Sequence, residues 1–176
     1  MKIGRPLAAI LLALGCGHGW AADAVADFKA LVEGCKASLA ARPATAVQFN
    51  EDLKSWVKTA RLPAEIRVDV QPTDSPTRPF SAVIDITDVV ANAKAPGEQA
   101  ARQLNVTAGD GLWTSSRFVQ TLNFAYEEGR WVPVDGTRTH AFRMKGAPQF
   151  DKPSSMRLSA ANMQDPQAPY AACIPK

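Results

Sequence analysis

The sequence predicts an α+β domain in which N-terminal helices pack on a curved antiparallel sheet of four or more strands. Three observations lead to this fold class. Apolar residues recur at spacings of three and four over residues 23–42. From Glu65 onward they alternate with polar residues instead, and short turns separate the alternating segments. Helices followed by strands in hairpin order are typical of α+β domains.

The chain begins with the features of a bacterial signal peptide. Lys2 and Arg5 precede the apolar run Leu7–Leu14, which is far shorter than the roughly 20 residues that span a bilayer. Gly19 and Ala21 place small residues at the two positions that a signal peptidase inspects, so cleavage is expected after Ala21, with Ala24 as the fallback. We therefore expect residues 1–21 to be removed and the mature protein to be periplasmic.

Cys16 offers an alternative to cleavage after Ala21. The segment Leu12–Cys16 resembles a lipobox, in which the cysteine is lipidated and becomes the new N-terminus. The match is imperfect, because Ala13 stands where leucine is preferred. A lipoprotein anchored through Cys16 is therefore the second hypothesis for localisation.

Residues 22–150 are expected to form a single α+β domain, followed by an irregular, proline-rich tail over residues 151–176. The formal net charge of +3 includes Lys2 and Arg5, so the mature chain is close to neutral. A near-neutral chain with interspersed charges gives no sign of a basic patch that would bind nucleic acids or anionic membranes. No second apolar stretch approaches the length of a transmembrane helix.

Cys35 and Cys173 are the two cysteines that remain after cleavage. An even number of cysteines in an exported protein predicts a disulfide, which would tie the tail back to the first helix. Because the closed loop would contain most of the mature chain, loop entropy gives an upper estimate of about 5 kcal/mol of stabilisation. The alternative is two unrelated buried thiols.

Two helices are expected at the start of the mature chain. The helix over residues 23–42 ends before Pro43, since a residue that precedes proline disfavours the helical conformation. A shorter helix is predicted over residues 51–60, with Asn50 as its N-cap. The core-facing positions of the first helix are Val25, Phe28, Leu31, Val32, Cys35 and Leu39.

Strands and one short helix are expected after Glu65. Ile66, Val68 and Val70 alternate with polar residues, as in a half-covered strand. A turn with three prolines leads to a strand over residues 80–90, and residues 98–104 fit a short helix. The core face of this second strand consists of Phe80, Ala82, Ile84 and Ile86.

The longest predicted strands cover residues 112–126 and 130–144, joined by a tight turn at Gly129. Phe118 and Leu122 mark the core face of the first. Pro133 predicts an edge position or a bulge in the second, because proline cannot donate to a strand ladder. Asp135-Gly136 fits either a bulge or a further hairpin turn.

The hairpin between these strands resembles a known structural element. The stretch Phe124–Asp135 (FAYEEGRWVPVD) is similar to the late hairpin of cystatin-like and NTF2-like folds, in which an acidic-glycine turn precedes a tryptophan and an apolar strand. The resemblance implies a curved sheet wrapped around a helix. It implies no function, since such folds host enzymes, carriers, inhibitors and interaction modules alike.

A set of aromatic and basic residues is predicted on the sheet face opposite Phe118 and Leu122. Tryptophan and arginine in one patch are typical of protein interfaces. Alternatively, the tryptophans cover the ends of the core and the arginines are solvated. The candidate binding residues are Trp113, Arg117, Arg130, Trp131, Arg138 and His140.

We expect a non-enzymatic module that binds another exported protein, for example an inhibitor or immunity-type protein. One alternative is a small hydrolase or isomerase around His140, paired with Asp135 or Tyr126. Another is a carrier of a small apolar ligand between helix and sheet. No catalytic residue or cofactor is predicted. No metal ligand is predicted either, because cleavage leaves one histidine, His140, and two bridged cysteines, which cannot form a usual zinc site.

Overall fold

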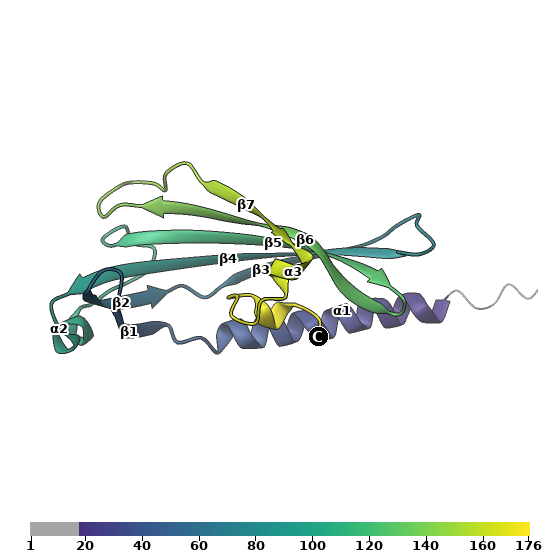
Figure 1. Cartoon of the computed structure of the whole chain (residues 1–176), viewed down its shortest axis with the longest axis horizontal. Helices are drawn as coiled ribbons and strands as arrows, with labels where there is room; N and C mark the ends of the chain where they lie inside the picture. Colours follow the sequence, from purple (N-terminus) through teal and green to yellow (C-terminus); the bar gives the residue numbers. More distant parts are fainter. Residues whose placement is uncertain (1–17) are drawn as a thin grey trace, which may run out of the picture.

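The structure is a computed structural model that describes the backbone of residues 18–176 and the side chains from Asp23 onward. One long helix and a seven-stranded antiparallel sheet dominate it (Figure 1), which confirms the α+β class. Most of the predicted signal peptide, with Cys16, lies outside the described residues. The predicted cleavage site at Ala21 falls in the first turn of the long helix.

The long helix α1 (His18–Ala40) packs along one face of the sheet, which we call the helix-side face. The ring of Phe28 lies 5.5 Å from that of Phe124 and 4.5 Å from that of Trp131. Val25 was predicted to face the core but is 46% exposed, because α1 presents a narrower apolar stripe than the spacing indicated. The buried stripe consists of Ala24, Phe28, Val32, Cys35 and Leu39.

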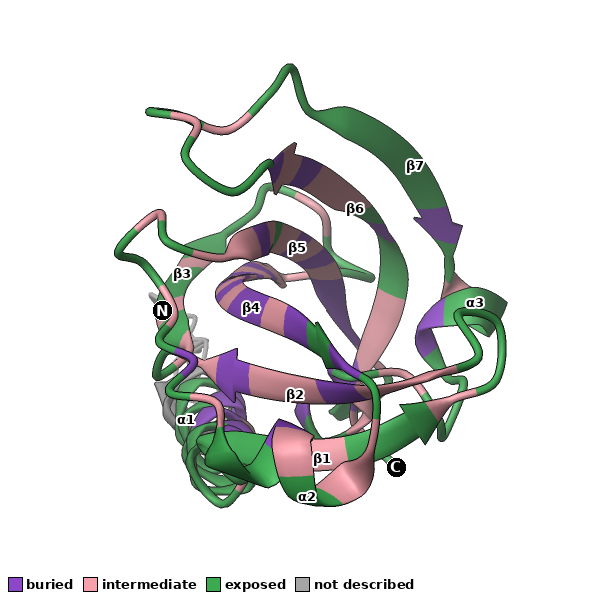
Figure 2. Ribbon diagram, turned by 90° about the vertical axis from the view of Figure 1, so that its left-hand side faces the viewer, coloured by how far each residue is buried: buried purple, intermediate pink, exposed green. Residues whose placement is uncertain are grey.

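The sheet is strongly curved from β1 to β7 (Figure 2), and its buried residues concentrate in the central strands. The strand order is β1-β2-β4-β5-β6-β7, and β3 also pairs with β4. The strands are β1 (Thr45–Asn50), β2 (Ser55–Arg61), β3 (Glu65–Pro72), β4 (Phe80–Ala95), β5 (Thr114–Glu127), β6 (Arg130–Arg143) and β7 (Ser154–Ser159).

Strands β2 and β3 share one edge of β4, end to end. Arg61 of β2 pairs with Val90, and Glu65 of β3 pairs with Thr87. The connection between them contains Pro63, which has no N–H to donate to β4. The edge of β4 is therefore interrupted opposite Asp88, although the backbone N–H of Leu62 still donates to the carbonyl oxygen of Val89, at 3.0 Å.

The predicted helix over residues 51–60 is wrong: β1, a tight turn and β2 form a hairpin there. Asn50 does accept a hydrogen bond from the backbone N–H of Leu53, at 2.8 Å, but it caps a turn. Phe49 and Trp56 pair across the hairpin, with ring centroids 5.8 Å apart. Val57 and Ala60 are three residues apart and both buried, which imitates a helical spacing. They are both buried because β2 is covered on both of its faces.

The predicted β5–β6 hairpin is confirmed, and the ambiguity at Asp135-Gly136 is resolved as a bulge. Asn123 pairs with Asp135 but the next residue, Phe124, pairs with Pro133, so Val134 is the extra residue. Pro133 lies in the part of β6 that β7 does not reach, because β7 pairs only from Asp135 onward. Its missing N–H therefore breaks no ladder on that side.

The predicted short helix is present as α2 (Glu98–Gln103). The segment around α2 covers part of the sheet face opposite α1. Lys58 of β2 donates from Nζ to the carbonyl oxygens of Arg102 and Leu104, at 3.0 and 2.6 Å. A small apolar cluster of Ala60, Ala91, Ala93 and Val106 lies beneath this segment.

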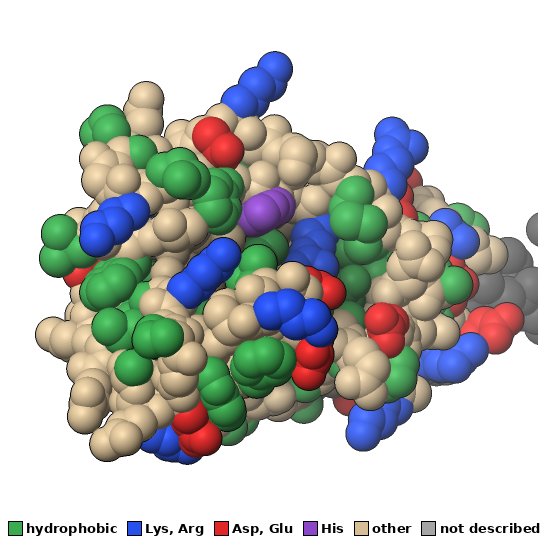
Figure 3. Space-filling model, turned by 60° about the vertical axis from the view of Figure 1, so that its left-hand side comes forward, with side chains coloured by type: hydrophobic (Ala, Val, Ile, Leu, Met, Phe, Trp, Pro, Cys, Tyr) green, Lys and Arg blue, Asp and Glu red, His purple; other side chains and the backbone are tan. Residues whose placement is uncertain are grey.

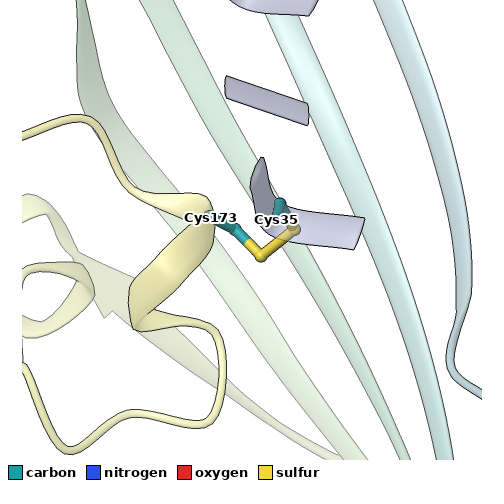
Figure 4. Close-up of a disulfide and its surroundings, with 2 residues drawn as sticks. All are labelled: Cys35 and Cys173. Carbon is teal, nitrogen blue, oxygen red and sulfur yellow. A yellow bond between two sulfur atoms is a disulfide. The ribbon is translucent and has the colours of Figure 1, made fainter. Parts of the chain in front are cut away.

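The tail is less irregular than expected, because Ser154–Ser159 adds β7 to the sheet and α3 (Ala160–Met163) follows it. The short 3-10 helix η1 (Ala171–Cys173) then returns the chain to α1 (Figure 4). There the predicted disulfide between Cys35 and Cys173 is confirmed. No helix among the described residues is long and apolar enough to cross a membrane.

Gly136 offers a test of the bulge. A Cβ atom on this residue would lie 2.5 Å from the backbone oxygen of Thr121, a distance that requires the paired strands to separate. We expect Gly136→Ala to lower the free energy of unfolding by about 1–3 kcal/mol in chemical denaturation. Gly34→Ala is the control, since Gly34 lies on the exposed side of α1 with open space around it. This substitution should stabilise the protein by about 0.5–1 kcal/mol. Equal effects of the two substitutions would contradict the bulge geometry.

Candidate functional site

The bulge in β6 divides the predicted binding residues between the two faces of the sheet. One extra residue reverses the alternation of β6 beyond Val134. His140 therefore pairs with Phe118 and lies on the helix-side face together with Arg138. Trp113 and Arg117 face the other side. The prediction that all of them share the face opposite Phe118 is wrong for Arg138 and His140.

Trp131 and Arg130 lie away from Trp113 and Arg117. Trp131 is a core residue whose Nε1 donates to the carbonyl oxygen of Ala24, at 2.8 Å. Arg130 is exposed beside Glu127, at the opposite end of β5, about 40 Å from Trp113 along the strand. The candidate residues thus do not form one patch, and two separate surfaces remain.

The first surface lies at the end of the sheet where β5 begins and β6 ends, on the face opposite α1. We call this end the loop end. The ring of Phe150 contacts two guanidinium groups: Cζ of Arg117 lies 4.4 Å from its centroid and Cζ of Arg143 lies 4.9 Å from it. Lys145 similarly lies over the ring of Trp113, with Nζ 5.5 Å from the centroid. A cavity of about 510 Å³ is lined by Phe150 and both arginines.

Two loops carry the apolar part of this surface. The backbone N–H of Gly146 donates to the carbonyl oxygen of Gly111, at 3.0 Å, and joins the loops. Leu112 and Met144, one from each loop, are 63% and 62% exposed. We call this surface the loop-end patch; its residues are Leu112, Trp113, Arg117, Arg143, Met144, Lys145 and Phe150.

Arg143 is the buried member of the loop-end patch, at 9% exposure. It donates to the oxygen of Gly109 at 3.5 Å and to Oγ of Ser115 at 3.4 Å, while Nε has no partner among the described residues. Within the same part of the chain Arg143 makes no salt bridge. The patch therefore holds a positive charge without a paired carboxylate.

Two carboxylates lie near the patch but are engaged elsewhere. Asp151 accepts a hydrogen bond from the backbone N–H of Phe142, at 2.6 Å. Asp110 accepts hydrogen bonds from Thr107 and from the backbone N–H of Leu112, which lower its pKa; the nearby charge of Arg143 adds to this effect. Both carboxylates hold the loops in place.

The second surface lies on the helix-side face, beyond the end of α1. Figure 3 shows the molecule hollowed at this end, with basic and apolar side chains and a histidine around the hollow. The rings of Phe118 and His140 stack at 4.6 Å, and Cζ of Arg138 lies 4.9 Å from the Phe118 centroid. With residues of β7 they line a hollow of about 290 Å³.

Asp88 is the central charged residue of the helix-side face. Its side chain is 7% exposed, and Oδ2 accepts hydrogen bonds from Nη1 of Arg61 at 2.5 Å and from Nη1 of Arg42 at 3.3 Å. Oδ1 has no partner among the described residues. Burial lowers the pKa of Arg42; Asp88 opposes this shift and Arg61 adds to it. The cluster carries one net positive charge.

The enzymatic alternative finds no support in the geometry around His140. Nε2 of His140 is buried without a hydrogen-bond partner among the described residues. Asp135 binds Asn123 at 2.7 Å instead, and Tyr126 packs on Trp131 in the core. No group of three potential metal-ligating His, Cys, Asp or Glu side chains occurs in the described part of the chain.

Comparison with known proteins identifies no relative. No protein-family model, no curated protein and no solved structure matches this chain. The resemblance of the β5–β6 hairpin to cystatin-like and NTF2-like folds therefore stays a prediction.

Sequence reasoning missed the Arg42–Asp88–Arg61 cluster, although a signal for it exists. Asp88 continues the alternation of buried residues through Ile84 and Ile86, so a carboxylate occupies a core-facing position of a strand. A charge in such a position predicts a buried partner. Arg143 and Phe150 give no comparable signal, because their contact depends on how the loop after β6 folds back over the sheet.

Asp88→Asn tests the cluster. The substitution keeps the size of the side chain but leaves two partly buried guanidinium groups without a counter-charge. We expect a loss of about 3 kcal/mol in the free energy of unfolding, measured by chemical denaturation. Asp69→Asn on the exposed side of β3 is the control and should change stability by less than about 0.5 kcal/mol. Equal free energies of unfolding for the two variants would contradict the central role of Asp88.

Proposed function

We propose that this protein is an exported, non-enzymatic module that binds another exported protein through the loop-end patch. The observation that carries the proposal is the exposure of Leu112 and Met144 beside three cation–π pairs. The proposal of export rests on the signal-peptide features of residues 1–21.

The composition of the patch favours a protein partner. Burying one leucine or methionine side chain contributes about 1.5–3 kcal/mol, and the two most exposed large apolar side chains here come from hydrogen-bonded loops. Trp, Met, Phe and Arg are the residue types enriched at interfaces. Trp113 and Phe150 already have cations stacked on them, so their rings are held in place before a partner arrives.

The charge of the patch indicates the chemistry of the partner. Arg117 and Arg143 flank Phe150 without salt bridges among the described residues, and Lys145 lies over Trp113. A segment that combines carboxylates with apolar side chains would pair with these cations and cover Leu112 and Met144. An inhibitor, immunity-type or accessory protein that masks an exported partner would use such a surface.

Site-specific photo-crosslinking in the native envelope tests the proposal. A photoreactive phenylalanine analogue at position 144 should yield a discrete adduct with another exported protein, identified by mass spectrometry. The same analogue at position 68, where Val68 is exposed on β3, should yield none. Arg117→Glu should reduce the adduct at position 144 at least tenfold, since it places a carboxylate against the acidic partner, whereas Arg67→Glu on exposed β3 should not.

Two results would count against the interface. One is an adduct pattern at position 144 that matches position 68; the other is an adduct that survives Arg117→Glu unchanged. In either case the loop-end patch would be an ordinary solvated surface.

A further inference from the structure

The break between β2 and β3 opens a cavity of about 510 Å³ at the C-terminal end of α1, on the helix-side face. This volume is within the range of about 300–1,000 Å³ that small-molecule sites occupy. We propose that the cavity binds an amphiphile with a single alkyl chain and an anionic head group. The head would contact Arg42 and Arg61, and the chain would lie along Leu39 and Ile66.

The arginines at this cavity have donors to spare. Each uses only Nη1 toward Asp88, and no other hydrogen bond from either side chain occurs among the described residues. A guanidinium has several N–H donors in a fork that matches a carboxylate or phosphate. Asp88 thus acts as a positioning residue, because one of its oxygens holds both guanidinium groups at the edge of the cavity.

The charges around the cavity favour an anion. Arg42 and Arg61 face the single carboxylate of Asp88, which leaves one net positive charge. Lys36 also lines the cavity but is bonded to Glu33 at 2.9 Å. Burial lowers the pKa of Arg42 and Asp88 only partly opposes this shift, so a bound anion would further stabilise the charged guanidinium.

The rest of the lining is apolar, which is why a simple inorganic anion is a poorer fit. Leu39 belongs to the buried stripe of α1, and Ile66 of β3 packs against the same core. An alkyl chain here would extend the core at the point where Pro63 interrupts the sheet. The remaining apolar lining residues are Ala40, Ala44, Leu62, Pro63 and Ala64.

Calorimetry with decanoate below its micelle concentration tests the site, with decyltrimethylammonium as a cation of the same chain length. We expect decanoate to bind at least tenfold more tightly than the cation. Ala44 is exposed at the edge of the cavity, so it tolerates replacement and supplies a matched pair. Ala44→Glu should weaken decanoate binding at least tenfold, whereas Ala44→Lys should preserve or strengthen it.

Amide NMR shifts then locate the ligand. Shifts clustered at residues 39–44 and 61–66 support the site. Equal affinity for the two amphiphiles, no decanoate binding, an unchanged affinity in Ala44→Glu, or shifts confined to the loop-end patch would each overturn the proposal. None of these results bears on the crosslink at position 144, which tests the opposite face.

A second experiment distinguishes a free amphiphile from a membrane lipid, since both combine an anionic head group with an alkyl chain. Vesicles of phosphatidylglycerol present anionic heads in a bilayer, while monomeric decanoate presents a free chain. Decanoate binding without cosedimentation of the vesicles supports a free amphiphile, as we propose. Cosedimentation that Ala44→Glu abolishes, without binding of monomeric decanoate, would replace the free amphiphile with a membrane lipid.

Discussion

Cys35 lies on the buried stripe of α1, and its disulfide to Cys173 joins that helix to the last turn of the chain. Among the described elements, α1 contacts the sheet and the short helix η1, so its position depends on the sheet beneath it and on the covalent link to η1. Cys173 and Ile174 are buried with it, and the C-terminal segment therefore completes the core instead of lying over it. A chain of this size with one apolar layer between helix and sheet has little stability to lose.

The position of α1 also decides where the molecule is free to bind. The core that α1 covers extends to Ile86 and Leu122, and β4 and β5 continue well beyond it. Past the end of α1 the helix-side face is mixed. Asp88 and its arginines lie at the break between β2 and β3, and Phe118 stacks on His140 across β5 and β6. On the other face, α2 and its flanking loop cover the sheet, and the loop-end patch lies beside them. The cavity at the end of α1 therefore follows from a sheet that is longer than its helix, whereas the loop-end patch lies on the face that α1 does not cover.

Local patterns predicted the elements that bury one face, and long-range pairing decided the rest. The stripe of α1, the alternation of β3 and β4, and the β5–β6 hairpin all follow from spacing, as does the disulfide. The β1–β2 hairpin did not, because β2 is covered on both faces and its buried residues imitate a helical period. The largest error in the predicted site comes from Val134. This one bulged residue places Arg138 and His140 on the opposite face of the sheet from the one predicted. Pro133 predicted a bulge, but spacing alone could not locate it relative to Asp135.

The covalent link between α1 and the C-terminus is the claim that can be tested most directly. Thiol titration of the denatured but unreduced mature protein, followed by denaturation with and without reductant, measures it. We expect no free thiol before reduction, and a loss of up to about 5 kcal/mol in the free energy of unfolding after it. Two titratable thiols in the unreduced protein, or an unfolding midpoint that reduction leaves unchanged, would contradict it.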